Sequence, residues 1–284
     1  MCLNRPSPHI QLGNNMQQAD DFLEECKTLY RFLETLGDED FQKVTQFKDW
    51  TVSDVVGHLH MWNWAADLSL NEPPAFQALL SGVTEKIIAG NTFREIEVDW
   101  LKDLKNRELL QEWQQFYIAM HGRFNKADPE KKVKWAGPDF SVRTSITGRL
   151  METWAHGQAI YDILGVKREV SDRISHIARL GVITFGWTFS NRGLDVPQNK
   201  PYVKLTAPSG KIWEWNAPSD DNFVDGSAEE FCQVVTQTRH FSDTSLKVVG
   251  KTAASWLSLA QCFAGLPSDP PEPGSRVMSS LKSI

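Results

Sequence analysis

Four long segments of helical periodicity in the N-terminal half constrain the fold more than any other feature of the sequence. Apolar residues recur there at intervals of three and four, which is the spacing of one helix face. The segments cover residues 17–36, 51–70, 98–125 and 145–164. Thr51 followed by Asp54 is typical of a helix start, and Gly165 is typical of a helix end. Four helices of this length joined by loops predict a helical bundle.

The C-terminal part carries a different pattern of short alternating runs bounded by turn residues. Residues 202–216 alternate on either side of a Ser209–Gly210 pair, which predicts a β-hairpin. Another strand is expected at 245–250. Further helices are expected at 172–188, 228–240 and 252–266. This part of the chain is therefore predicted to be α+β.

These patterns divide the chain of 284 residues into four parts. Residues 1–15 are expected to be a disordered lead-in, and 16–168 a helical bundle. Residues 169–268 are expected to form a small α+β domain. The proline- and serine-rich residues 269–284 are expected to be a flexible tail.

Composition excludes several classes of protein. The formal net charge is -6 and the pI is about 5.7, so neither nucleic acid nor an anionic membrane surface is an expected partner. No apolar run is long enough to span a bilayer. The four cysteines form no C-x-x-C pair, which argues against a cysteine-based zinc ribbon or a secreted disulfide scaffold. The N-terminus shows no secretory signal, and a cytoplasmic location is expected by default.

One helical segment carries a carboxylate and an imidazole that can bind a metal together. Glu152 and His156 are four residues apart and therefore share a helix face. His58, on the second predicted helix, has apolar neighbours and is expected to point into the bundle. Two histidines and one carboxylate leave a fourth coordination position free, as in catalytic zinc sites. The ligand set favours Zn²⁺ and also suits Fe²⁺, Ni²⁺ or Mn²⁺.

Simpler roles compete with this interpretation. Arg149 is three residues before Glu152, so the carboxylate could form an ordinary ion pair, and His58 could be a core histidine. Tryptophans near the proposed site could wall a substrate pocket or pack in the core. The candidate substrate contacts are Arg149, Ser141, Arg143, Trp62 and Trp154. No G-x-G-x-x-G, Walker A, G-x-S-x-G or H-E-x-x-H motif is present.

Two motifs resemble the mycothiol-dependent maleylpyruvate isomerase family of the DinB-like metal-binding superfamily. They are DWTVSDVVGHL at 49–59 and GRLMETWAHGQ at 148–158. Runs in the C-terminal part, such as LTAPSGKIWEW at 205–215, are similar to an uncharacterised metal-binding subgroup. The resemblance implies a four-helix bundle followed by a domain similar to sterol carrier proteins.

The resemblance also implies a site and a cofactor. It assigns zinc binding to His58, Glu152 and His156, and it implies a low-molecular-weight thiol as cosubstrate. Relatives usually carry an aspartate three residues after the last ligand histidine, where this chain has Ala159. A role of that aspartate beside the metal is therefore missing here.

These observations predict a metal-dependent enzyme that activates a thiol for isomerisation or S-transfer on a small electrophilic substrate. One alternative is a metal-dependent isomerase, cyclase or hydrolase that acts on a small molecule without a thiol. The other is a non-catalytic protein that binds a metal or an apolar ligand. The aromatic candidates for lining an apolar ligand cavity are Trp213, Trp215 and Phe223. The sequence does not determine the oligomeric state.

Overall fold

The computed structural model describes residues 16–279, so the predicted lead-in 1–15 lies outside the described residues. Four long helices pack against one another around the larger hydrophobic core. They are α1 (Gln17–Glu34), α2 (Val52–Asn71), α5 (Asn106–Lys126) and α6 (Val142–Leu164). The four helical segments predicted from periodicity correspond to these helices, although the third one is divided.

Two shorter helices lie between α2 and α5, where the sequence predicted a loop and the start of one long helix. They are α3 (Pro73–Ile88) and α4 (Phe93–Leu101). Pro73 and Pro74 occupy the first positions of α3, where proline is well tolerated. The predicted helix 98–125 is wrong because the chain breaks at Lys102, whose φ is 56°.

The second half is built on a four-stranded mixed sheet, which agrees with the predicted α+β class. Its spatial order is β4–β3–β5–β6. The strands are β3 (Tyr202–Thr206), β4 (Ile212–Trp215), β5 (Phe223–Ser227) and β6 (Lys247–Val249). The predicted hairpin is present as the antiparallel pair of β3 and β4. Strand β5 pairs with β3 in parallel and with β6 in antiparallel orientation.

Four helices accompany this sheet and enclose a second core. They are α7 (Ser175–Ile183), α8 (Phe185–Ser190), α9 (Ala228–Val235) and α10 (Lys251–Leu257). The predicted helix 252–266 is too long, because α10 ends at Leu257 and an irregular segment follows. The remaining short elements are the hairpin β1 (Lys132–Val133) and β2 (Phe140–Ser141), and the 3-10 turns Asp40–Gln42, Asp172–Ile174 and Phe241–Asp243.

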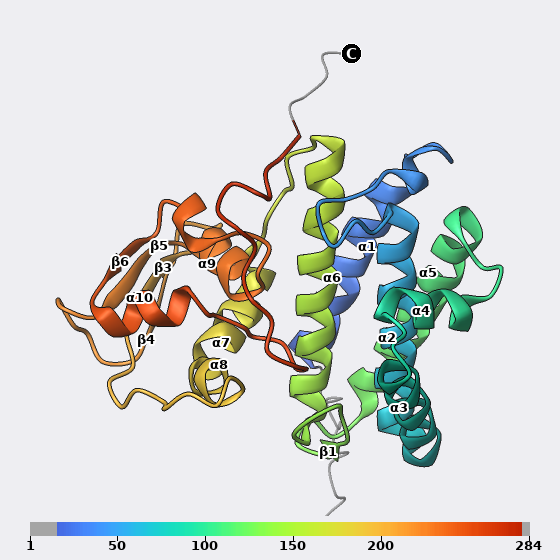
Figure 1. Cartoon of the computed structure of the whole chain (residues 1–284), viewed down its shortest axis with the longest axis horizontal. Coiled ribbons are helices and arrows are strands. Elements are labelled where there is room, and N and C mark those ends of the chain that lie inside the picture. Colours follow the sequence, from blue (N-terminus) through green and yellow to red (C-terminus); the bar gives the residue numbers. More distant parts are fainter. Residues whose placement is uncertain (1–15, 280–284) are drawn as a thin grey trace, which may run out of the picture.

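Helix α6 connects the two halves. It stands between the other long helices and the sheet-containing part (Figure 1). Leu150 and Ile160 pack into the first core, whereas Met151 and Trp154 pack into the second. A helix that is apolar on several sides is expected to be buried, and α6 has more buried residues than any other helix in the described part of the chain.

The C-terminal segment from residue 269, predicted to be a flexible tail, lies across both halves as far as it is described. The Arg276 guanidinium donates to the Gln237 carbonyl in the second half. The Val277 amide donates to the side chain of Gln46 in the first half, at 2.8 Å. Within residues 16–279, no helix is both long and apolar enough for a membrane span.

Candidate metal centre

Three side chains from two helices converge at the surface of the helical half. One ligand atom each of His58, Glu152 and His156 can be chosen so that all three lie within 4.8 Å of one another. Glu152 Oε2 is 3.5 Å from His58 Nε2 and 3.0 Å from His156 Nε2. The side chains are 15%, 22% and 12% exposed in chain order, so the cluster is partly open to solvent.

The loop before α2 supplies an aromatic wall beside the two imidazoles. The ring centroid of Phe47 is 4.8 Å from that of His156, in an edge arrangement. The ring centroid of Trp50 is 5.3 Å from that of His58. Residues Lys48 and Asp49 have positive φ, which produces the tight turn between these aromatic rings.

A second carboxylate, which sequence reasoning missed, orients the first histidine. Glu97 on α4 is only 3% exposed, and its Oε1 lies 2.7 Å from His58 Nδ1. The Trp62 indole N–H donates to the same oxygen at 2.8 Å. This pairing places the Nδ1 hydrogen of His58 toward Glu97 and directs Nε2 toward Glu152. The segment around Glu97 offered no metal-ligand spacing that could have identified it.

The charges in the cluster follow from these contacts. Burial alone would lower the pKa of His58, but the Glu97 charge and the contacts with both carboxylates outweigh it and raise that pKa to about 9. Burial would raise the pKa of Glu152, but hydrogen bonds from His156 and His58 hold it well below its ordinary value. Burial and the charge on His58 lower the pKa of His156. Without a cation, the cluster is therefore held together by a protonated His58 and an ionised Glu152.

The ligand atoms fit a small divalent cation. In a tetrahedral site with bonds of about 2.1 Å, two ligand atoms are roughly 3.4 Å apart. The distances from Glu152 Oε2 to the two imidazole nitrogens, 3.5 and 3.0 Å, are close to this value. Two nitrogens and one oxygen also form the donor set of catalytic zinc sites that keep a position open. Among the residues that the structure describes, this is the one group of three or more His, Cys, Asp or Glu side chains whose ligand atoms all lie within 4.8 Å of one another.

The candidate substrate contacts lie in different surroundings. Trp62 is beside the cluster, with its ring centroid 6.2 Å from that of His58. Arg149 is 4% exposed and its Nε donates to Asn63 Oδ1, while its Nη2 has no hydrogen-bond partner among the described residues. Trp154 is buried in the second core beneath the Arg168 guanidinium.

The other two candidates lie at the start of α6, away from the cluster. Ser141 caps the helix by accepting a hydrogen bond from the Thr144 amide. Arg143 pairs with Glu130 at 3.0 Å. Both side chains therefore have structural partners, and the structure does not bring them to the His58–Glu152–His156 cluster.

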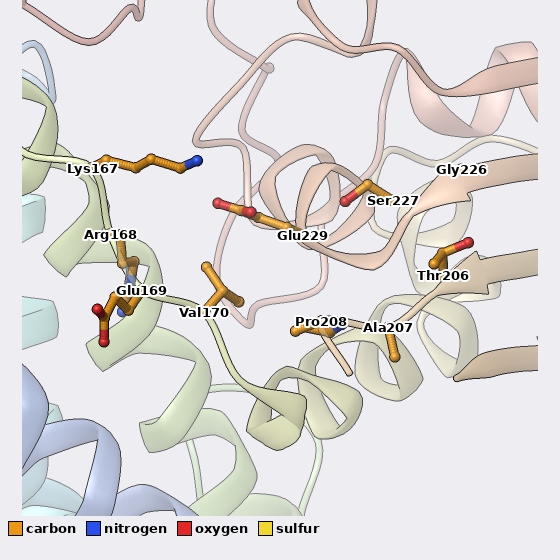
Figure 2. A pocket seen from close by; sticks show the side chains of 10 residues that line it. All are labelled: Lys167, Arg168, Glu169, Val170, Thr206, Ala207, Pro208, Gly226, Ser227 and Glu229. Atoms are coloured by element: carbon orange, nitrogen blue, oxygen red, sulfur yellow. The ribbon is translucent and has the colours of Figure 1, made fainter. Parts of the chain in front are cut away.

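A large cavity lies elsewhere, where the linker after α6 faces the sheet. Its volume is about 970 Å³, and Figure 2 shows the side chains around it. Lys167 from the linker and Glu229 from α9 extend into the space from opposite sides (Figure 2). Burial raises the pKa of Glu229. This cavity shares no residue with the His58–Glu152–His156 cluster.

Fold and cluster together define a protein with a helical half, a smaller α+β half and a candidate metal centre on the helices. The sequence model of the mycothiol maleylpyruvate isomerase N-terminal domain matches residues 22–161. Uncharacterised proteins from two strains of Mycobacterium tuberculosis are each 35% identical to this chain over 218 residues, which is 77% of this chain and 84% of theirs. The chain belongs to the mycothiol maleylpyruvate isomerase family, which confirms the family indicated by the two sequence motifs.

Solved structures with a similar arrangement include the crystal structure of the mycothiol-dependent maleylpyruvate isomerase. It superposes with a TM-score of 0.49 at 14% sequence identity, over 77% of this chain and 87% of that one. A crystal structure of a histidine-to-alanine mutant of the same enzyme gives the same values.

Proposed function

We propose that this protein is a metal-dependent enzyme that uses a low-molecular-weight thiol to isomerise, or transfer sulfur to, a small electrophilic substrate. His58, Glu152 and His156 hold the cation, which is Zn²⁺ in this proposal. The observation that carries the proposal is the convergence of these three side chains at ligand distances on partly exposed helix faces. Membership of the mycothiol maleylpyruvate isomerase family supports the thiol.

Each side chain around the cluster has a role in this proposal. A divalent cation bound there lowers the pKa of a coordinating thiol, so that it reacts as a thiolate at neutral pH. Glu97 orients the His58 ring, and Phe47 and Trp50 shield the side of the cluster from bulk water. The same proposal includes the fold. Residues 16–168 form a DinB-like four-helix bundle that carries the cluster, and residues 169–268 form a domain similar to sterol carrier proteins.

Metal analysis tests the first part of this proposal. Protein purified without added metal should contain about one equivalent of zinc, because a complete ligand set binds it tightly. His156→Ala should lose most of this metal. His240→Ala removes a half-buried histidine outside the cluster and should retain the metal. Less than about half an equivalent of any transition metal in the unmodified protein would contradict a metal-dependent function.

A thiol panel tests the second part. Maleylpyruvate, the substrate named for the solved relative, is the first compound to assay, with mycothiol, glutathione and cysteine supplied separately. Turnover should require one of these thiols and should disappear in His156→Ala but not in His240→Ala. Equal turnover with and without every thiol would favour thiol-independent metal chemistry instead.

A further inference from the structure

A second surface groove lies between the edge of the sheet and the starts of two long helices. Its volume is about 690 Å³, within the range of roughly 300–1,000 Å³ that small-molecule sites occupy. Strand β4 forms one wall, and α7 with the first turns of α1 and α6 forms the other. The lining residues are Gln18, Arg143, Ser175, His176, Arg179, Ile212, Trp213, Glu214 and Trp215.

Two tryptophans make the sheet wall of this groove aromatic. Trp213 and Trp215 alternate with exposed residues along β4 and are themselves half-buried. Their ring centroids are 6.5 Å apart. β4 is an edge strand, and both rings pack partly against the second core while keeping part of their surface open. Phe223, the third aromatic candidate in this half, does not line the groove.

The helical wall is cationic. Arg179 is exposed and has no ion pair or hydrogen bond among the residues that the structure describes. Arg143 lines the same groove, and its ion pair among the described residues is with the exposed Glu130. His176 is paired with Asp21 at 2.9 Å. Glu214 is the carboxylate of the lining, and it accepts a hydrogen bond from the Tyr202 hydroxyl. The groove therefore offers one free and one partly compensated guanidinium opposite two indole rings.

This groove is separate from the candidate metal centre. Arg143 precedes Glu152 by nine residues on the same helix, which corresponds to about 13 Å along the helix axis. No lining residue belongs to the His58–Glu152–His156 cluster. A substitution in the groove therefore leaves the side chains of the metal centre in place, and a substitution in the metal centre leaves those of the groove in place.

We propose that the groove is a binding site for a small planar aromatic anion. The aromatic ring of the ligand stacks on one of the two indoles, Trp213 or Trp215, and meets the other edge-on, because the planes of these indoles are 73° apart. The anionic group pairs with the guanidinium of Arg179, assisted by Arg143. Indole faces favour planar π-systems, and guanidinium groups favour carboxylate or sulfonate oxygens. This assignment goes beyond the proposed thiol chemistry and does not depend on it.

Anilinonaphthalene sulfonate, a planar aromatic anion whose fluorescence rises on binding, is the probe for this site. The full-length protein should bind one molecule per chain. Arg179→Gln should weaken binding by about fivefold or more, because it removes a charged hydrogen-bond donor from an exposed position where the fold does not need it. Arg143→Gln should weaken binding less, because Glu130 already pairs with that side chain. Lys251→Gln removes an exposed cation outside the groove and is the matched control.

Two further measurements separate this site from nonspecific adsorption and from the metal centre. The uncharged analogue N-phenylnaphthylamine should bind more weakly, and its binding should not respond to Arg179→Gln. His156→Ala should bind the sulfonate as well as the unmodified protein does. The proposal is overturned if the double variant Arg143→Gln/Arg179→Gln binds the sulfonate with unchanged affinity, or if the uncharged probe binds equally well. If His156→Ala loses its metal or its thiol-dependent turnover, the test of sulfonate binding in the groove is unaffected.

Discussion

Glu97 contacts His58 in a way that the sequence could not indicate, and replacing Glu97 tests whether this contact orients the histidine for metal binding. Glu97→Gln keeps the size and a hydrogen-bond acceptor for His58 but removes the charge. We expect the affinity for Zn²⁺ to fall by about tenfold, as for other carboxylates that orient metal-binding histidines. Competition with a chromophoric zinc chelator measures this change. Glu112→Gln, an exposed replacement on α5, is the control, and equal affinities of the two variants would argue against an orienting role.

His60 belongs to the opposite side of α2 and predicts an acid-sensitive component of stability. Burial lowers its pKa from the ordinary 6.5 to about 4, and its Nδ1 has no hydrogen-bond partner among the described residues. Since the unfolded chain binds this proton near pH 6.5 and the folded chain does not, stability falls as the pH drops from about 6.5 to 4. The full effect is on the order of 3 kcal/mol.

Urea unfolding at pH 7 and pH 4.5, in the presence of a chelator, measures this dependence. His60→Gln should lose less stability between the two pH values than the unmodified protein does. His240→Gln, which changes a histidine in the other half of the molecule, should keep the original difference. An unchanged pH dependence in His60→Gln would show that other groups cause the acid sensitivity.

At this scale, the sequence predicted the three candidate ligands but not the residues that support them. His58, Glu152 and His156 follow a helical spacing that can be read locally, together with a resemblance that points to the same positions. Glu97 and His58 lie on different helices and are 39 residues apart in the sequence, so no local pattern encodes their contact. Arg143 and Ser141 looked available because their partners, Glu130 and the Thr144 amide, become visible only in the fold.

At the scale of single elements, the start of α2 fixes the approach of the aromatic loop to the candidate metal centre. The Thr51 hydroxyl accepts from the Asp54 amide at 3.1 Å, and the Asp54 carboxylate accepts from the Thr51 amide at 2.8 Å. Thr51→Ala should destabilise the protein by about 1 kcal/mol, as the loss of such caps does. Thermal unfolding checks this, and Thr51→Ser, which keeps the hydroxyl, should unfold close to the unmodified protein. Equal losses in both variants would exclude the cap as the cause.

Elements with strong caps and long apolar stripes were predictable, whereas elements defined by tertiary contacts were not. Helix α2 was expected from its capping pair, and α6 from its stop at Gly165. Strand β5 was missed because its Asp225–Gly226 pair looks like a turn, and only the pairing with β3 makes it a strand. The break at Lys102 was missed because no glycine or proline marks it.

At the scale of the whole molecule, buried charges join the two halves near the linker. The Arg168 guanidinium pairs with Glu25 on α1, and the two side chains are only 2% and 5% exposed. The same guanidinium donates to the Trp154 carbonyl and lies over the Trp154 ring. Near the C-terminal end of α6, Arg239 forms two hydrogen bonds of 2.7 Å with Asp162. The sequence could not reveal these pairs, since each links residues distant along the chain.

The pair of Arg168 and Glu25 predicts strong coupling between the linker and α1. Arg168→Met should cost about 3 kcal/mol, because Glu25 remains buried with only the longer contact to Arg173, at 3.2 Å. Removing both charges, in Glu25→Gln/Arg168→Met, should cost less than the sum of the two single changes, because neither charge is then left buried without its partner. Guanidinium denaturation of the four proteins completes this double-mutant cycle. Strictly additive losses would mean that the ion pair does not couple α1 to the linker, and that apolar packing along α6 and the pair of Arg239 with Asp162 hold the two halves together.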